Sequence, residues 1–245
     1  MKLSGAAAIV TGAGRGLGAE VARDLARRGA RVVLVARTAS ELAEVAASIR
    51  AAGGEAHALV FDVSRKDHVV PLVQAASELV GPAELLVMCA STLGPLPMPL
   101  LFDTECEDLA HVLETNLVGP FRLAKAVGAG MLVRGGGALV FVSSDAAVTP
   151  YPGWGAYGVS KAAQDHLAAT LAVELEGSDV RVLTVDPGEM DTRMHADALP
   201  DADRATLLRP EAVAAVLVDA VADRAGTPSG ARVLAAERLA QRVAS

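Results

Sequence analysis

The sequence has few aromatic residues, little cysteine and no excess of positive charge. Aromatic residues make up 3% of the 245 positions and apolar residues 52%, so we expect a core of aliphatic side chains. The two cysteines do not form a disulfide framework, and Cys89 lies in an apolar run typical of a small buried residue. The formal net charge of −7, without a basic cluster, argues against nucleic acid or an anionic membrane surface as a partner.

The sequence also lacks a long apolar segment near its start and a pattern of metal ligands. The first apolar run, residues 6–10, ends at Thr11 and is too short for a signal peptide or a membrane span. The five histidines show no spacing typical of metal ligands. We therefore expect a cytoplasmic protein with no membrane partner and no metal site.

Short aliphatic runs alternate with amphipathic stretches of ten or more residues along most of the chain. This alternation predicts right-handed strand–helix–strand units and an α/β fold: a doubly wound parallel sheet with helices on both faces, of the Rossmann type. No repeat or long linker interrupts it, so we expect one domain over residues 1–245. The expected strands are Ala6–Val10, Arg31–Val35, Ala56–Phe61, Glu84–Cys89, Ala138–Val142, Val180–Val185 and Ala231–Ala235. The expected helices are Gly16–Arg28, Ser40–Ala51, Lys66–Leu79, Glu105–Leu113, Asn116–Val133, one that carries Tyr157 and fades near Gly177, and Pro210–Asp223.

A glycine-rich turn joins the first expected strand to the first expected helix. It reads Thr-Gly-Ala-Gly-Arg-Gly-Leu-Gly over residues 11–18. Glycines let the backbone turn sharply and approach a pyrophosphate, whose charge the helix N-terminus then stabilises. Such loops also serve as ordinary turns, but this one occupies the first strand–helix junction, which is the context that dinucleotide binding requires.

The end of the second expected strand indicates which dinucleotide is bound. An acidic residue there would bind the ribose 2′-hydroxyl of NAD, whereas an arginine pairs with the 2′-phosphate of NADP. The chain has Arg37 and no acid at this point, and Arg15 in the glycine turn is a second cation. These two arginines favour NADP(H), although both can also be solvated surface charges. Asp62 follows the third expected strand, where it either lies beside the adenine or caps the next helix.

A second group of residues suits proton transfer to or from an oxygen. Tyr157 and Lys161 are four residues apart and share one face of a helix, and Ser144 ends an apolar strand thirteen residues before Tyr157. A tyrosine and a lysine at this spacing arise in about 3% of shuffled sequences of this composition. Alone, Tyr157 and Lys161 can be an exposed pair on a helix, and Ser144 can belong to an ordinary turn at the end of a strand. The rest of the sequence therefore decides whether these residues form a catalytic group.

Together these residues resemble the classical short-chain dehydrogenase/reductase family, from the turn at residues 11–18 to about Thr192. The resemblance implies that the segment from Pro187 to Thr192 binds the nicotinamide carboxamide, through the Thr192 hydroxyl and the Met190 backbone. The implied catalytic residues are Asn116, Ser144, Tyr157 and Lys161. With the two arginines added, the expected cofactor-binding residues are Gly12, Arg15, Gly16, Leu17, Gly18, Arg37, Thr38, Asp62, Val63, Ala90, Tyr157, Lys161, Pro187, Gly188, Met190 and Thr192.

The chain departs from the family pattern in two places. The family's Asn-Asn-Ala-Gly after the fourth strand is replaced by Met-Cys-Ala-Ser at residues 88–91, so we expect a different bracing of the sheet and the site. The Gly-rich ending after the last strand is replaced by Leu-Ala-Ala-Glu-Arg at residues 234–238, which leaves open the usual C-terminal contribution to oligomer and substrate pocket.

The expected chemistry is proton transfer at a carbonyl oxygen. Tyr157 is the expected general acid and base, and we expect the Lys161 ammonium to lower its pKa by about 1–3 units from a free value near ~10. The resemblance implies that Ser144 orients the substrate oxygen and that Asn116 holds a water that relays protons to Lys161. The neighbours that can tune substrate choice are Asp145, Tyr151, Trp154 and Glu189.

The sequence thus predicts an NADP(H)-dependent oxidoreductase that interconverts a ketone and a secondary alcohol. The first alternative is an NAD(H)-dependent alcohol dehydrogenase of the same family. The second is a non-catalytic dinucleotide-binding sensor or scaffold. The expected partners are a small-molecule carbonyl or alcohol substrate and, by resemblance, further copies of the chain in a homodimer or homotetramer.

Overall fold

A computed structural model describes residues 1–244, and these residues fold around one parallel sheet. The sheet has seven strands in the order β3-β2-β1-β4-β5-β6-β7, and every neighbouring pair is parallel. This confirms the expected doubly wound parallel sheet. The strands are β1 (Ala7–Thr11), β2 (Arg31–Ala36), β3 (Glu55–Val60), β4 (Leu85–Met88), β5 (Gly137–Val142), β6 (Val180–Asp186) and β7 (Arg232–Leu234).

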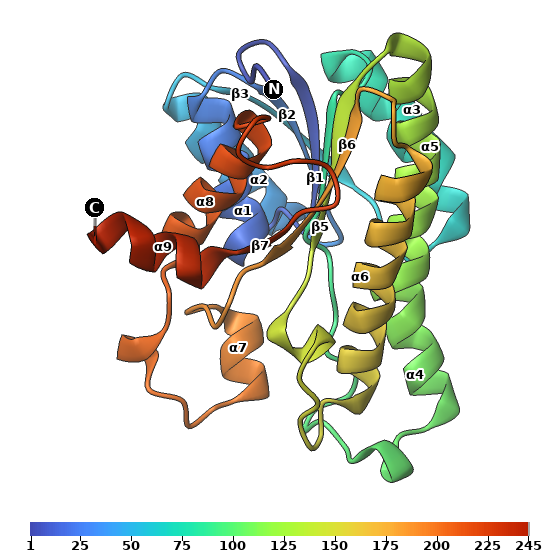
Figure 1. Ribbon diagram of the computed structural model, residues 1–245, viewed down its shortest axis with the longest axis vertical. Coiled ribbons are helices and arrows are strands. Elements are labelled where there is room, and N and C mark those ends of the chain that lie inside the picture. The colour runs from blue at the N-terminus through green and yellow to red at the C-terminus, as the bar shows by residue number, and fades with distance from the viewer. Residues whose placement is uncertain (245) are drawn as a thin grey trace.

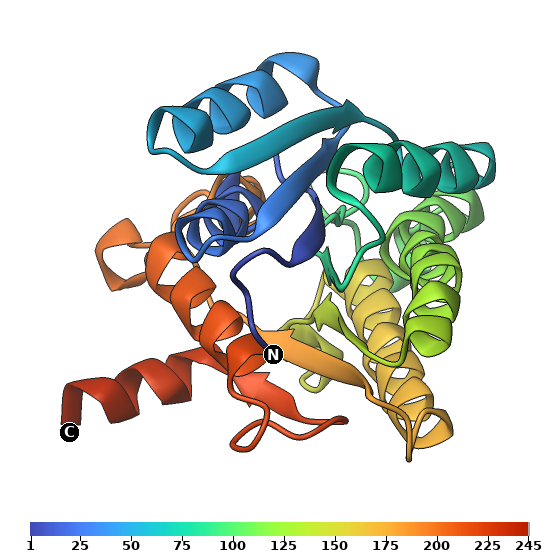
Figure 2. The same ribbon diagram turned by 90° about the horizontal axis from the view of Figure 1, so that it is seen from above.

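Helices cover both faces of the sheet (Figures 1 and 2). One face is packed by α1 (Gly16–Arg27), α2 (Ala39–Ala51) and α8 (Pro210–Ala222), and α9 (Ala235–Ala244) lies beside α8. The other face is packed by α3 (Lys66–Val80), α5 (Gly119–Arg134) and α6 (Gly155–Glu174). The remaining helices are α4 (Cys106–Leu113) and α7 (Arg193–Ala198), with a π-helical turn η2 (Glu114–Val118) and three short 3₁₀ turns, η1 (Leu101–Asp103), η3 (Asp145–Ala147) and η4 (Arg204–Thr206).

The central strands β1, β4 and β5 are almost wholly apolar because both of their faces are buried. In β1, Ala8 and Val10 pack into the core on the α1 side, and Ala7 and Ile9 pack into the core on the α3 side. Alternate residues of a strand point to opposite faces, so a strand covered on both sides has no polar positions to spare. This explains the continuous apolar runs of the sequence.

The expected elements are present with boundaries shifted by at most three residues, and two helices were not expected. The short helix α7 begins after Thr192, whose hydroxyl accepts a hydrogen bond from the His195 amide. The C-terminal α9 occupies the place of the usual Gly-rich ending, where Leu239 packs against the core beside α8. The π-helical turn η2 joins α4 to α5 without a break and takes the place of the first residues of the helix expected from Asn116 to Val133. There the Gly119 Cα lies so close to the Val63 carbonyl that a Cβ would come within 2.4 Å of its oxygen.

Candidate active site

The glycine turn forms a close-packed cradle at the carboxyl end of β1. Gly12 has φ +66° and Gly16 has φ +54°, a backbone region that side chains other than glycine rarely adopt. A Cβ on Gly12 would lie 2.7 Å from the Ala90 amide nitrogen, and a Cβ on Gly18 would lie 2.3 Å from the Gly12 carbonyl oxygen. Only glycine fits at these two positions, so the turn keeps its backbone exposed at the N-terminus of α1, as a pyrophosphate requires.

The departure at residues 88–91 gives the site a bracing of its own. The Thr11 hydroxyl accepts from the Ala90 amide at 3.3 Å, which ties β1 to the end of β4. The Asn116 side-chain oxygen accepts from the Ser91 hydroxyl at 3.1 Å and from the Thr92 amide at 2.8 Å. Thus the serine in place of the family glycine supplies one of the links between β4 and the π-helical turn, and the different bracing expected from the sequence is present.

The two expected cations lie at the open end of β2, with exposed side chains. The Arg15 guanidinium lies 3.4 Å from the Glu41 carboxylate on α2. Arg37 is near enough to Asp62 to act on its charge: burial raises the pKa of Asp62, but hydrogen bonds from Ser64 and the Arg37 charge bring it below the ordinary value. The Asp62 carboxylate accepts from the Ser64 amide and hydroxyl and so forms a local turn; it does not cap α3, whose N-cap residue is Arg65.

Ser144 lies at the end of β5 with its hydroxyl held between two neighbours. It donates to the Asp145 carboxylate at 2.9 Å and accepts from the Ala146 amide at 3.2 Å. The second Asp145 oxygen accepts from the Tyr151 hydroxyl at 2.9 Å. Ser143 is 2% exposed, whereas Ser144 is half-buried at the cavity described below.

Tyr157 and Lys161 lie on the first two turns of α6, both buried, but the expected effect on the phenol is wrong for this structure. Burial, with the charges of Asp145 and Asp186, raises the pKa of Tyr157 to about 12. The Lys161 ammonium does not contact the phenol oxygen; it lies 5.7 Å from the ring centroid and donates to the Val142 carbonyl at 2.7 Å. Desolvation therefore outweighs attraction. Burial also lowers the pKa of Lys161 to about 8.

Gln164 connects Lys161 to Asn116. Its side-chain oxygen lies 3.4 Å from the Lys161 ammonium, and its side-chain nitrogen donates to the Asn116 carbonyl at 2.7 Å. The Asn116 amide group is fully used, because its nitrogen donates to the Thr92 carbonyl and to the Ser160 hydroxyl, each at 2.9 Å. A direct amide bridge thus joins the two residues that the family resemblance connects through a water.

The segment after β6 closes the site on the side of α1. Gly188 has φ +69°, and its amide donates to the Asp186 carboxylate at 3.0 Å. Thr192 faces the glycine turn, since a Cβ on Gly16 would lie 3.5 Å from the Thr192 methyl. The expected carboxamide-binding segment and the expected pyrophosphate turn therefore lie against each other, as one dinucleotide site would require.

A cavity of about 290 Å³ opens beside the Tyr157 phenol. Its apolar walls include Leu93, Trp154, Met194 and Ala198. The four residues expected to tune substrate choice, Asp145, Tyr151, Trp154 and Glu189, all line it, together with Ser144, Pro187, Gly188, Met190, Thr192 and His195. The His195 Nε2 atom is buried without a hydrogen-bond partner and lies 3.8 Å from the Glu189 carboxylate.

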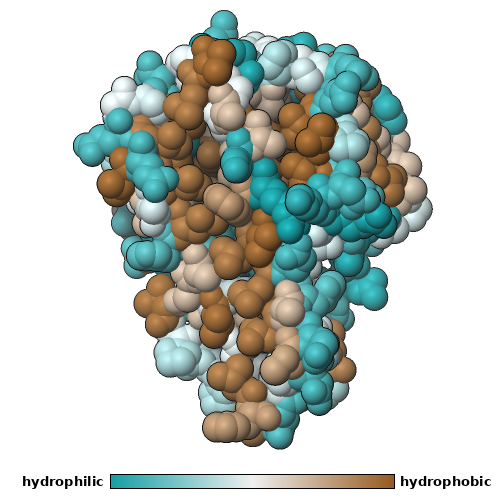
Figure 3. Space-filling model, turned by 90° about the vertical axis from the view of Figure 1, so that its right-hand side faces the viewer, coloured by the Kyte–Doolittle hydropathy of each residue, from teal (hydrophilic) through white to brown (hydrophobic). Residues whose placement is uncertain are grey.

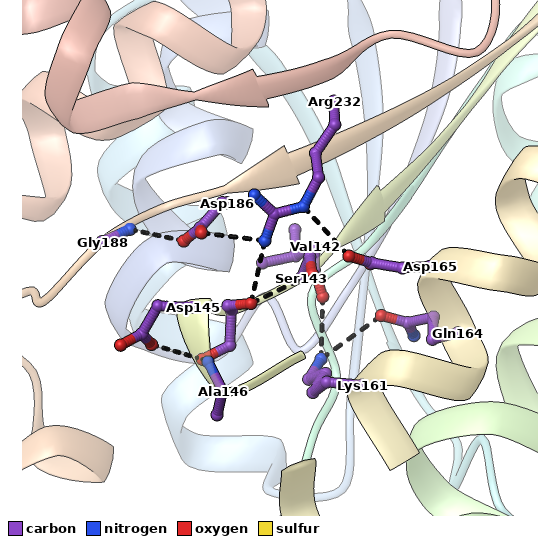
Figure 4. Close-up of polar contacts among 11 residues, drawn as sticks. Val142, Ser143, Asp145, Ala146, Lys161, Gln164, Asp165, Asp186, Gly188 and Arg232 are labelled. Atoms are coloured by element: carbon purple, nitrogen blue, oxygen red, sulfur yellow. Dashed lines mark hydrogen bonds and ion pairs between the residues drawn. The ribbon is translucent and has the colours of Figure 1, made fainter. Parts of the chain in front are cut away.

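Sequence reasoning missed an arginine at the back of the site. Arg232 of β7 reaches Asp165 of α6, Asp186 at the end of β6 and the Ser144 carbonyl (Figure 4). The only sequence signal is that Gln164 and Asp165 follow Lys161 by three and four residues, which places them near it on α6. Nothing in the sequence places Arg232 beside them.

The expected residues come together as two neighbouring groups at the carboxyl edge of the sheet. The glycine turn, Ala90 and the segment from Pro187 to Thr192 form one group, and Asn116, Ser144, Tyr157 and Lys161 form the other. A doubly wound sheet that carries both defines a dinucleotide-type oxidoreductase.

Comparison with known proteins agrees with this class. The family model described as "short chain dehydrogenase" matches residues 6–203. The chain belongs to the short-chain dehydrogenase family, as its motifs indicate.

Relatives and solved structures extend this comparison. The chain is 33% identical over 241 residues to a glycine betaine reductase from Emericella nidulans; the match covers 98% of the chain but only 17% of that relative. It is 34% identical to an NADPH-dependent aldehyde reductase-like chloroplastic protein from Arabidopsis thaliana, over 80% of the chain and 77% of the relative. A short chain dehydrogenase from Shigella flexneri complexed with NADP superposes with a TM-score of 0.88 at 27% identity, over 96% and 98% of the two chains.

Proposed function

We propose that this protein is an NADP(H)-dependent oxidoreductase that interconverts a ketone and a secondary alcohol, with Tyr157 as general acid and base. One observation carries the proposal. The phenol of Tyr157 and the hydroxyl of Ser144 line one cavity, with the Lys161 ammonium buried behind them, beside a glycine cradle shaped for a dinucleotide.

The cradle supports a dinucleotide as the cofactor. Gly12, Gly16 and Gly18 would hold its pyrophosphate, and the segment from Pro187 to Thr192 would hold its nicotinamide end. Bound NADP(H) supplies the hydride. Arg37, with Arg15 nearby, supports NADP(H) over NAD(H), because an arginine pairs with a 2′-phosphate. The Shigella structure complexed with NADP is a family precedent for this choice.

The protein's own part is to place the substrate oxygen and move a proton. With a pKa of about 12, the Tyr157 phenol is protonated at neutral pH and can donate to a carbonyl oxygen that gains negative charge. Ser144 would turn its hydroxyl from Asp145 to the same oxygen. The Lys161 ammonium would stabilise the tyrosinate left behind through its charge and supply the replacement proton, and Gln164 would hold Lys161 in place from the side of Asn116.

The cavity favours neutral or positively charged carbonyl compounds. Its walls are mostly apolar, and the charged side chains among its described lining residues are the carboxylates of Asp145 and Glu189. A substrate carboxylate or phosphate near them would be repelled and poorly solvated. We therefore expect uncharged ketones and aldehydes, or amine-bearing ones, to be the better substrates.

The same proposal includes one domain and self-association. The single sheet supports the expectation that residues 1–245 form one domain. The face formed by the helices on the right of Figure 1 carries many exposed apolar side chains (Figure 3), among them Phe121, Val133 and Val173, which supports a homodimer or homotetramer. No described helix is long and apolar enough to cross a membrane. The cytoplasmic location stays a prediction from the sequence.

A matched pair of tyrosine variants tests the proposal. Tyr157→Phe and Tyr151→Phe each remove one phenolic oxygen beside the same cavity, and the chain contains only these two tyrosines. We expect Tyr157→Phe to lower kcat for carbonyl reduction by about 10²–10⁴-fold, and Tyr151→Phe to retain most of kcat. NADPH oxidation with a panel of ketones, aldehydes and quinones measures both. Turnover that survives Tyr157→Phe unchanged contradicts the assigned acid. A parent protein that binds NADPH but reduces nothing supports the sensor alternative.

A further inference from the structure

Arg232 joins three parts of the site that are distant in the sequence. It lies on β7 in register with Thr184 of β6, and its guanidinium extends toward the carboxyl edge of the sheet (Figure 4). Its Nε donates to the Asp165 carboxylate at 3.0 Å. One of its terminal nitrogens donates to the Asp186 carboxylate at 2.9 Å and to the Ser144 carbonyl at 3.0 Å. Only a planar fork of donors holds three such acceptors at fixed angles.

Each acceptor belongs to a part of the proposed reaction. The Ser144 carbonyl belongs to the residue whose hydroxyl would hold the substrate oxygen. Asp165 follows Lys161 by one helical turn. Asp186 precedes the turn at Gly188, and its carboxylate accepts a hydrogen bond from the Gly188 amide. The side chains are shielded from water: Arg232 is 29% exposed, Asp165 is 19% exposed and Asp186 is 9% exposed.

The charges of the two carboxylates act on the two proton carriers. Burial lowers the pKa of Lys161, and the charge of Asp165 opposes that effect. Burial raises the pKa of Tyr157, and Asp186 raises it further, as does Asp145. The positive charge of the Arg232 guanidinium compensates the negative charges of Asp165 and Asp186, with which it forms ion pairs. The second oxygen of Asp165 is buried and has no hydrogen-bond partner. Without that cation, two largely buried carboxylates would face the proton carriers uncompensated.

We propose that Arg232 is a positioning residue of the active site: it anchors the backbone of Ser144 and limits the negative charge that Asp165 and Asp186 place around Lys161 and Tyr157. The proposal rests on the proposed function for its catalytic readout. Its electrostatic part concerns the folded protein alone, and can be measured without turnover.

The first measurement is the ionisation of Lys161 in the absence of any substrate. The chain has four lysines, so side-chain carbon NMR of labelled lysine gives few signals, and the signal missing in Lys161→Met identifies the residue. In Arg232→Met we expect the pKa of Lys161 to rise by about one unit, because Asp165 is no longer compensated. In Arg232→Lys and in the Arg232→Met/Asp165→Asn double variant we expect it to stay near the parent value.

The second measurement separates placement from charge. In carbonyl reduction, Arg232→Met should lower kcat by about 10-fold or more through loss of the Ser144 anchor, and should move the alkaline limb of the pH profile upward. Arg232→Lys should leave the alkaline limb of the pH profile at its parent position but should lower kcat, because an ammonium lacks the planar set of donors that a guanidinium offers to several acceptors. The control is Arg224→Met, which removes an exposed arginine paired with Asp179 far from the cavity; it should change neither quantity.

The outcomes distinguish the two proposals. A parent protein without turnover contradicts the proposed function, while the Lys161 titration still tests Arg232. If the Lys161 pKa in Arg232→Met equals that of the parent, the electrostatic role is wrong; if kcat also equals that of the parent, the whole proposal is overturned. Thermal unfolding of each variant shows that the comparison is between folded proteins. Should Arg232→Met not fold, Arg232→Lys tests the placement role, because its kcat should fall while its Lys161 pKa stays near the parent value; a kcat equal to that of the parent then overturns the proposal.

Discussion

Cofactor selectivity depends on the exposed guanidinium of Arg37 at the end of β2. A hydrogen bond between a charged donor and a phosphate contributes about 1.5–3 kcal/mol. Replacing Arg37 by alanine should therefore weaken NADPH binding by about 10- to 100-fold. NADH has no 2′-phosphate, so its dissociation constant should change by about threefold or less. The same change also removes a cation near Asp62, which raises the pKa of that carboxyl but leaves it ionised at neutral pH.

The second arginine contributes less, because it is shared. Arg15 lies 3.4 Å from the Glu41 carboxylate, and both side chains are solvated. Exposed pairs of this kind are worth at most about 1 kcal/mol. Glu41→Gln keeps the shape of the side chain and frees Arg15 from its partner, so NADPH should bind more tightly by up to about fivefold. Arg15→Ala should remove that gain.

Fluorescence titration of NADPH and NADH into the parent, Arg37→Ala and Glu41→Gln measures these effects at low and high salt. Exposed charges are screened by salt, so the preference for NADPH should shrink as salt rises. Equal affinities for the two cofactors in the parent protein would refute the two-arginine reasoning and favour the NAD(H) alternative. An Arg37→Ala variant that weakens both cofactors equally would show that Arg37 supports the fold of the loop and does not bind the phosphate.

Three further changes test other parts of the site. Gly12→Ala should lower the free energy of unfolding by about 1–3 kcal/mol or more and abolish dinucleotide binding, since it meets the Ala90 backbone at a positive φ; thermal melts with and without NADPH measure both. Gln164→Ala should lower kcat by about 10-fold with little change in KM, because it removes the bridge from Lys161. Lys161 has a folded pKa of about 8 against 10.5 ordinarily, so the unfolded state binds more protons between these values. The unfolding free energy of the parent relative to Lys161→Met should therefore rise from about pH 8 upward, by about 3 kcal/mol in all. Urea unfolding of both proteins at several pH values up to about 9 follows the beginning of this rise, and a difference that does not change with pH would contradict the buried ammonium.

The fold was predictable because its signals are local and repeated. Aliphatic runs such as residues 32–35 are buried on both faces. A run of that composition between two helices is typical of a parallel strand covered on both sides. Two helices, α7 and α9, were not predicted, each for a different reason. The six residues of α7 are fewer than a periodic pattern needs to be seen, and α9 stands where a resemblance led us to expect a Gly-rich ending.

The site was predictable where a motif fixes both residue type and spacing, as for Tyr157 and Lys161. It was not predictable where function depends on contacts between distant segments. Arg232 lies 46 residues from Asp186 and 67 from Asp165, and only the parallel pairing of β6 with β7 brings them together. The direction of the Tyr157 pKa shift also needed the structure, because it depends on how deeply the phenol is buried and on where the Lys161 ammonium points.

The ionisation of Tyr157 favours carbonyl reduction over alcohol oxidation at neutral pH. Reduction needs the phenol, which is the dominant form of a group whose pKa is raised to about 12. Oxidation needs the tyrosinate as a base, and its fraction rises about tenfold for each pH unit below the pKa. The kcat/KM for oxidation should therefore climb steeply from pH 7 towards 9, while that for reduction should not rise and should fall once Lys161 loses its proton near pH 8. Initial rates in both directions measure this contrast. An oxidation rate independent of pH over this range would mean that the base is another group, or that binding lowers the Tyr157 pKa to the working pH.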